Sequence, residues 1–175
     1  MNINVLCRVL AVAAACLWAG QTIAQTNDSK SDLTFAQKSG QVGMAEVQLG
    51  KMAQEKGASP AVKRFGERMV MDHTRLNREL IGIARREGIA LPQNLDSKHQ
   101  EEMEQLRKAN GMEFDRLYAK EMVTGHEKTI ELFENEAHNG QDPALKALAE
   151  KAIPILKEHL RLAKETAREV SAEVK

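Results

Sequence analysis

Apolar residues recur at steps of three and four along most of this chain, the spacing that places them on one face of a helix. After Pro60 the apolar positions are Val62, Phe65, Met69, Leu76, Leu80 and Ile83. The pattern predicts helices over about 32–56, 60–87, 97–108 and 112–138, and from 143 onward. Strand signals are absent and β-branched runs are few, so the sequence predicts an all-α protein.

Two of the predicted helices begin alike, with Ser59-Pro60-Ala61-Val62-Lys63 and Asp142-Pro143-Ala144-Leu145-Lys146. Ser or Asp serves as the N-cap, and Pro takes the first helical position, where its missing N–H costs nothing. Each follows another long helix, which predicts two helical hairpins. A crossover of about 22 residues, with the short helix inside it, joins the hairpins. This order predicts a four-helix bundle of the ferritin-like topology.

Glycine and proline residues inside the predicted helices indicate how the helices pack and bend. Five glycines lie there, each costing up to about 1 kcal/mol against alanine: Gly43, Gly50, Gly66, Gly82 and Gly125. We expect some of them to permit close helix approach. Pro154 lies within the last helix and should kink it.

The N-terminus has the pattern of a secretory signal peptide over residues 1–24. Arg8 precedes an apolar run, and the small residues before Gln25 predict cleavage after Ala24 and a periplasmic location. Lipoprotein processing at Cys16 is a weaker alternative, because Ala13 to Ala15 provide no large aliphatic residue. Residues 25–31 are polar and predict a flexible leader, followed by one bundle domain over 32–170.

Charge and cysteine content exclude several classes of function. The chain has 175 residues with 25 basic and 25 acidic ones, and Arg8 is the only charge in the signal. The mature part therefore has a net charge of −1, with no basic field for nucleic acid or anionic lipid. The two cysteines of the full chain, Cys7 and Cys16, both lie in the signal, so the mature chain has no disulfide and no thiolate ligand. Signal cleavage would also leave no transmembrane anchor.

Four polar residues interrupt the apolar stripes at matched distances from the two turns. Glu46 lies fourteen residues before Pro60 and His73 thirteen after it. His126 lies seventeen before Pro143 and His159 sixteen after it. Antiparallel helices would bring Glu46 level with His73, and His126 level with His159, all facing one core. Three imidazoles and one carboxylate suit a single zinc, copper or iron ion.

The surrounding residues narrow the chemistry without defining a reaction. A ferritin-like di-iron site needs Glu-x-x-His motifs, but Val70, Val123 and Leu156 stand three residues before the histidines. Met69 and Met122 lie one turn before a histidine and weakly favour copper, although methionine is an ordinary core residue. The neighbouring acids Asp72, Glu127 and Glu158 should lie outside the ligand set, and His99 and His138 on the surface. Tyr118 is expected to pack in the core, and no nucleophile motif is visible.

A set of short segments spread over about residues 33–168 carries a family resemblance: Phe35-Ala36, Glu46, Leu49-Gly50-Lys51-Met52-Ala53, Ser59-Pro60, Met69-Val70-Met71-Asp72-His73-Thr74, Phe114-Asp115, Tyr118, His126, Asp142-Pro143, Pro154 and His159-Leu160. In these segments the chain resembles a family of exported bacterial proteins, domain of unknown function 4142. The family implies a ferritin-like bundle in the periplasm or at the outer membrane, and the inward Glu and His positions match its pattern. It implies no settled activity.

Two hypotheses of function remain open at the level of sequence. In the first, Glu46 and the three histidines bind one transition-metal ion for sequestration or stress protection. In the second, the same residues form a structural polar network, and the protein is a helical scaffold or envelope-stress protein that acts through a protein partner or as a homo-oligomer. An enzyme is less favoured than either, because neither an acid–base pair nor a nucleophile can be named.

Overall fold

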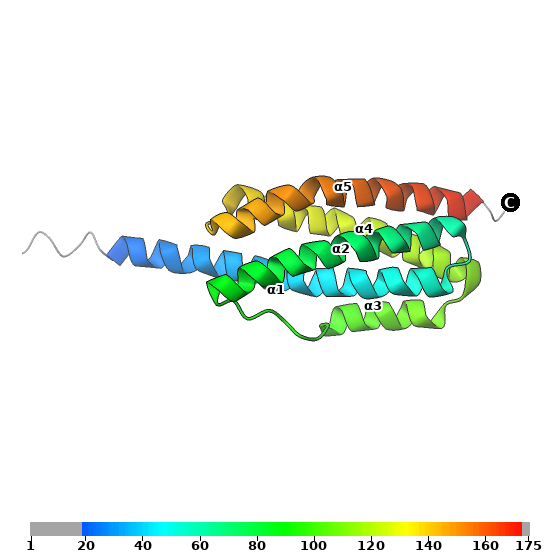
Figure 1. Cartoon of the computed structure of the whole chain (residues 1–175), viewed down its shortest axis with the longest axis horizontal. Coiled ribbons are helices and arrows are strands. Elements are labelled where there is room, and N and C mark those ends of the chain that lie inside the picture. The colour runs from blue at the N-terminus through cyan, green and yellow to red at the C-terminus, as the bar shows by residue number, and fades with distance from the viewer. Residues whose placement is uncertain (1–18, 173–175) are drawn as a thin grey trace, which may run out of the picture.

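Five helices make up the part of the chain that the computed structural model describes, residues 19–172, with side chains described from Lys30. They are α1 (Ala19–Lys56), α2 (Pro60–Glu87), α3 (Ser97–Lys108), α4 (Gly111–Asn139) and α5 (Pro143–Ala172) (Figure 1). No strand occurs among these residues. The all-α prediction is confirmed, and the bounds of α2, α3 and α4 lie within a residue of those expected.

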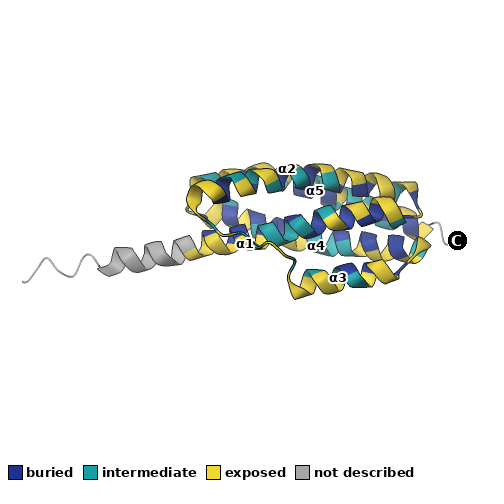
Figure 2. Ribbon diagram, turned by 60° about the horizontal axis from the view of Figure 1, so that its bottom comes forward, coloured by how far each residue is buried: buried dark blue, intermediate teal, exposed yellow. Residues whose placement is uncertain are grey.

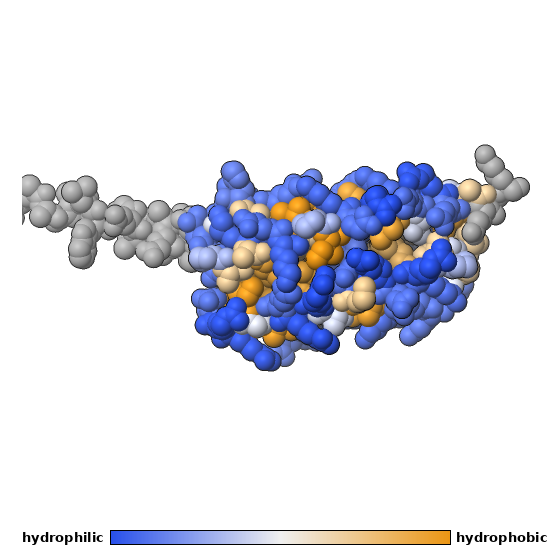
Figure 3. Space-filling model, turned by 45° about the horizontal axis from the view of Figure 1, so that its top comes forward, coloured by the Kyte–Doolittle hydropathy of each residue, from blue (hydrophilic) through white to orange (hydrophobic). Residues whose placement is uncertain are grey.

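The four long helices lie alongside one another as two hairpins, α1 with α2 and α4 with α5 (Figure 1). The hairpins meet through α2 against α5 and α1 against α4, while α3 packs against α1 and α4. Buried residues line the inward faces and exposed residues the outward ones (Figure 2). In the face shown in Figure 3, most of the surface is hydrophilic, with hydrophobic atoms in strips between the charged side chains.

The core consists of two apolar clusters, one toward each end of the bundle. The first includes Phe65, Met69 and Met122, and the second includes Leu76, Ile130 and Leu156. Along α2, α4 and α5, a buried histidine stands between the residues of one cluster and those of the other. Burying a polar group without a hydrogen-bond partner costs free energy. The histidines of this middle layer are therefore the candidate functional groups of the core.

Local capping sets the starts of α2 and α5, as predicted. The Ser59 hydroxyl accepts from Ala61 N at 3.1 Å. Asp142 Oδ1 accepts from Ala144 N and Leu145 N, both at 2.8 Å. These bonds satisfy N–H groups that the first helical turn leaves without partners.

A second pair of caps, which the sequence analysis missed, joins the two hairpins. Asp115 of α4 accepts from Ala58 N at 3.0 Å and Ser59 N at 2.6 Å, in the α1–α2 turn. Asp32 of α1 accepts from Gln141 N at 3.0 Å and Asp142 N at 2.8 Å, in the α4–α5 turn. Each hairpin therefore provides a buried carboxylate that holds the turn of the other.

Close helix approach through glycine is confirmed where α1 crosses α2. A Cβ at Gly50 would lie 2.8 Å from Gly66 O, and a Cβ at Gly66 would lie 2.6 Å from Gly50 O. Distances this short are forbidden to real side chains, so these two glycines allow the backbones to touch. Gly82 has only the end of Arg86 near it, at 3.8 Å, and plays no such part.

The N-terminal region differs from the prediction. Helix α1 begins at Ala19 and includes residues 25–31, for which the sequence predicts a flexible leader. Extending an existing helix adds a hydrogen bond for each residue fixed, which explains how the polar stretch continues it. Residues 1–18, most of the predicted signal, lie outside the described residues, so the signal and its cleavage stay predictions. Within the described residues, no helix has the length and apolarity needed to span a membrane.

Candidate metal centre

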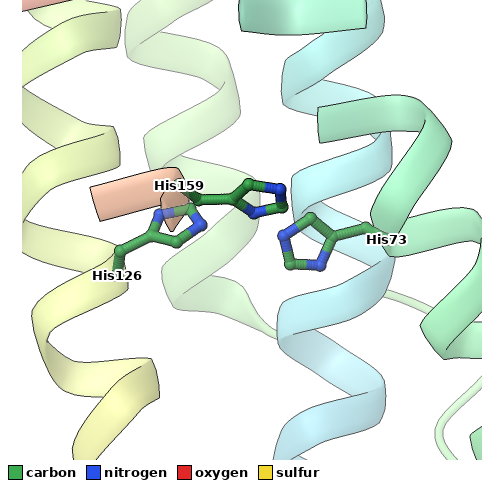
Figure 4. A group of neighbouring side chains, drawn as sticks. All are labelled: His73, His126 and His159. Atoms are coloured by element: carbon green, nitrogen blue, oxygen red, sulfur yellow. The ribbon is translucent and has the colours of Figure 1, made fainter. Parts of the chain in front are cut away.

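Three histidines from three helices converge in the middle layer of the bundle. His73 of α2, His126 of α4 and His159 of α5 are each at most 3% exposed. Their ring centroids lie 5.8 Å (73–126), 5.3 Å (73–159) and 5.4 Å (126–159) apart. One nitrogen from each ring lies within 4.8 Å of the others, and the rings are turned toward one another (Figure 4). The predicted inward orientation of the three histidines is confirmed.

Hydrogen bonds hold two of these rings so that one nitrogen of each is left over. His126 Nδ1 lies 2.9 Å from Met122 O, and because a carbonyl only accepts, this nitrogen carries the proton. His159 Nε2 lies 3.0 Å from Asp72 Oδ2, and since that carboxylate also accepts from Arg68, His159 donates here too. Within the described residues, His73 Nε2, His126 Nε2 and His159 Nδ1 are buried and have no hydrogen-bond partner.

Such a set is unusual, because buried polar atoms are nearly always partnered. Burial lowers the pKa of all three histidines, and neighbouring histidines lower those of His73 and His126 further, so that the pKa of His126 is about 4. The rings are therefore neutral at pH 7 and offer lone pairs, the form in which imidazole binds a metal. We call His73, His126 and His159 the histidine triad.

Asp72 supports the triad from behind and is not one of its members. This carboxylate is 3% exposed and also pairs with Arg68 and Arg75. Burial raises the pKa of Asp72, but hydrogen bonds from Arg68 and His159 outweigh it, and the pKa lies below its usual value. A carboxylate that orients a histidine is a common second partner of metal ligands. The arginines at positions 68 and 75, one turn on either side of Asp72, were the sequence signal for its burial.

Glu46 lies beside the triad but outside the group of ligand atoms that lie within 4.8 Å of one another. Its Oε1 is 3.9 Å from Nδ1 of His126, and that nitrogen already donates to Met122 O. Its Oε2 is buried without a partner among the described residues. Burial, followed by the charges of Glu121 and Glu102, raises the pKa of Glu46 to about 8. Glu46 is therefore mostly neutral at pH 7 in the metal-free chain.

The donor set of the triad fits a small transition-metal ion. Tetrahedral zinc with bonds of about 2.0–2.1 Å holds its ligand nitrogens roughly 3.3–3.4 Å apart, so small ring rotations would complete the site. Three histidines leave one position open in such a site. A cavity of 20 Å³, large enough for about one water, adjoins His73 and is lined from all four long helices.

The remaining candidates lie apart from the triad. Glu127 pairs with Lys164 and Glu158 with Arg161, all of them near the surface. His138 is exposed, while His99 is half-buried against Asp96. Tyr118 packs on Phe114 and Phe65, as expected, although its buried hydroxyl has no partner among the described residues.

The fold and this layer define an all-helical protein with a buried histidine cluster. The chain belongs to the DUF4142 family: the family's model, described as a domain of unknown function, matches residues 19–166. No curated protein and no solved structure matches the chain.

Proposed function

We propose that this protein is an exported ferritin-like bundle that binds one transition-metal ion through His73, His126 and His159. The observation that carries the proposal is the convergence within 4.8 Å of three histidines, each with a buried, unpartnered ring nitrogen. Imidazole suits zinc, copper and iron, and sequestration or stress protection in the periplasm is the role we assign. Glu46 stands next to the triad as a nearby carboxyl group.

The protein orients the imidazole rings of the triad before a metal ion binds. Met122 O and Asp72 orient two of the three rings, and apolar clusters pack on both sides of the layer. A bound ion would supply positive charge to which the three lone pairs point. No group in the layer is arranged as a nucleophile, so we propose binding and not catalysis.

Metal titration of the untagged mature protein tests the proposal. Metal analysis should find one ion per chain, and zinc at 100 times its Kd should stabilise the fold by about 2.7 kcal/mol. His73→Leu should abolish the stabilisation, while His138→Leu, at an exposed position, should leave it unchanged. Absence of bound metal, together with no stabilisation by zinc, copper or iron, would favour the structural polar network instead.

A further inference from the structure

The two sides of the histidine triad differ in the charged groups that cover them. On the side formed by α2 and α5, Asp72 is covered by Arg68 and Arg75, whose side chains are 46% and 56% exposed. On the side formed by α1, α3 and α4, the charged groups that act on the Glu46 carboxyl group are Glu121, Glu102 and Lys98. A cation approaching the triad meets arginines on the first side and mainly carboxyl groups on the second.

Glu121 and Glu102 form the outer part of the acidic side. Glu121 of α4 is half-buried, and Glu102 of α3 has a side chain 20% exposed. Burial, followed by the charge of Glu102, raises the pKa of Glu121. Carboxyl groups held together in this way favour a bound cation, because it removes their repulsion.

Glu46 continues this line of carboxyl groups to the triad. Gly125 lies one helical turn after Glu121 on the same face of α4, and a Cβ there would be 3.7 Å from Glu46 Oε1. The Glu46 carboxyl group therefore lies against this turn of α4, with Oε1 3.9 Å from His126 Nδ1. Its Oε2 is buried without a partner among the described residues. Five residues separate Glu121 from His126, a rise of about 7.5 Å.

Lys98 covers the outer end of this line. Its ammonium group lies 2.5 Å from Glu102 Oε1, and its side chain is 62% exposed. An exposed lysine on a four-carbon stem can swing into solvent. It therefore stands where an entering cation would first be bound.

We propose that Glu102, Glu121 and Glu46 form an entry path for a divalent cation to the triad, with Lys98 as a tethered cation that must leave first. This inference rests on the proposed function. The path gives the crossover helix α3 a role, because α3 supplies both Glu102 and Lys98. Carboxyl groups lining an approach raise the rate of association with a cation through attraction, without being ligands in the final site.

Stopped-flow mixing of the metal-free protein with Co²⁺ tests the path. The double variant Glu102→Gln/Glu121→Gln should slow association at least 10-fold, within the range for electrostatic steering. Dissociation should slow by the same factor, because the ion leaves by the same path, so Kd stays unchanged. Lys98→Gln should speed association, and added salt should slow the wild type more than the double variant. The control Lys151→Gln, from an exposed α2–α5 pair with Glu79, should bind at the wild-type rate.

The outcomes separate the two proposals. If the wild type takes up no Co²⁺, zinc, copper or iron, the triad is not a metal site and the path fails with it. If Co²⁺ binds but both rate constants are unchanged in the double variant and in Lys98→Gln, the triad stands and the path is overturned. The Lys98→Gln variant alters only an exposed side chain, so it decides the question even where the double variant folds poorly.

Discussion

The two hairpins are alike at their turns and different in their middle. Pro60 and Pro143 are 83 residues apart, and so are Gly57 and Gly140, and Asp32 and Asp115. The two aspartates do equivalent work, since each accepts N–H groups from the turn of the other hairpin. The chain is therefore an internal repeat in which each half closes the other.

In the middle layer, residues that are 83 positions apart are no longer alike. Its four polar residues correspond to different residues in the other hairpin: Glu46 to Thr129, His73 to Leu156, His126 to Gly43, and His159 to Leu76. Two of the histidines thus stand where the other hairpin has a core leucine. The repeated features account for the architecture, and the departures from the repeat make up the candidate site.

Removing a shared cap should have the largest effect on stability. Asp115→Ala leaves the N–H groups of Ala58 and Ser59 without their acceptor, and we expect the free energy of unfolding to fall by about 2–4 kcal/mol. Asp32→Ala should cost slightly less, because its turn is only partly buried. Denaturant unfolding measures both, and the exposed Arg116→Ala should change less than about 0.5 kcal/mol. A negligible loss in both variants would show that the repeat does not depend on these caps.

The second-largest loss of stability is expected where the Gly50–Gly66 contact is disturbed by giving the first hairpin a residue of the second. Gly66 corresponds to Ala149, but Gly66→Ala would bring Cβ within 2.6 Å of Gly50 O. We expect a loss of about 1–3 kcal/mol from overpacking. Gly82→Ala, with open space around it, should instead gain up to about 1 kcal/mol from helix propensity. Thermal unfolding of both variants would contradict this if the two shifts had the same sign.

Much of this architecture is visible in local sequence. Helix bounds follow from the three- and four-residue spacing and from caps such as Ser59 and Asp142, which act within a few residues. The caps from Asp32 and Asp115 act across more than 50 residues and escaped that kind of reasoning. Their equal distance from Pro60 and Pro143 is a signal that aligning the two halves of the chain would have shown.

The candidate site was predictable in part for the same reason. Apolar neighbours placed His73, His126 and His159 on inward faces, which is enough to bring three rings together in a bundle. The position of Glu46, whose Oε1 lies near Gly125 and His126, depends on how α1 is rotated. Equal height above a turn does not contain that information, so the approach of Glu46 to His126 was not predicted.

Restoring the leucine of the repeat at the triad should stabilise the metal-free protein. His73→Leu places at 73 the residue that the other hairpin has at 156 and removes a buried nitrogen without a partner. We expect the free energy of unfolding to rise by about 1–2 kcal/mol. Denaturant unfolding in a chelator measures this, with the exposed His138→Leu as control. A clear loss of stability would mean that the triad is a structural network.

The smallest expected effect concerns Glu136, another departure from the repeat, since it stands where the first hairpin has Ala53. Glu136 is 1% exposed, and its Oε1 has no partner among the described residues. Burial, followed by the charges of Asp32 and Asp142, raises its pKa to about 7. Because the folded pKa lies above the unfolded value, the folded state holds the proton more tightly. Stability from this group is therefore full below about pH 4.5 and is lost as the pH rises through 7.

Glu136→Gln keeps the shape of the side chain without the charge and should remove this dependence. We expect the variant to match the wild type at pH 5 and to exceed it at pH 8 by about 1 kcal/mol, a value reduced for solvent screening. Measuring the difference at each pH cancels the contribution of Glu46, which is present in both proteins. The exposed Glu131→Gln should show no such trend. A difference that shrinks toward pH 8 would place the carboxyl group of Glu136 among the stabilising partners of the α4–α5 turn, and its role would then resemble that of Asp32.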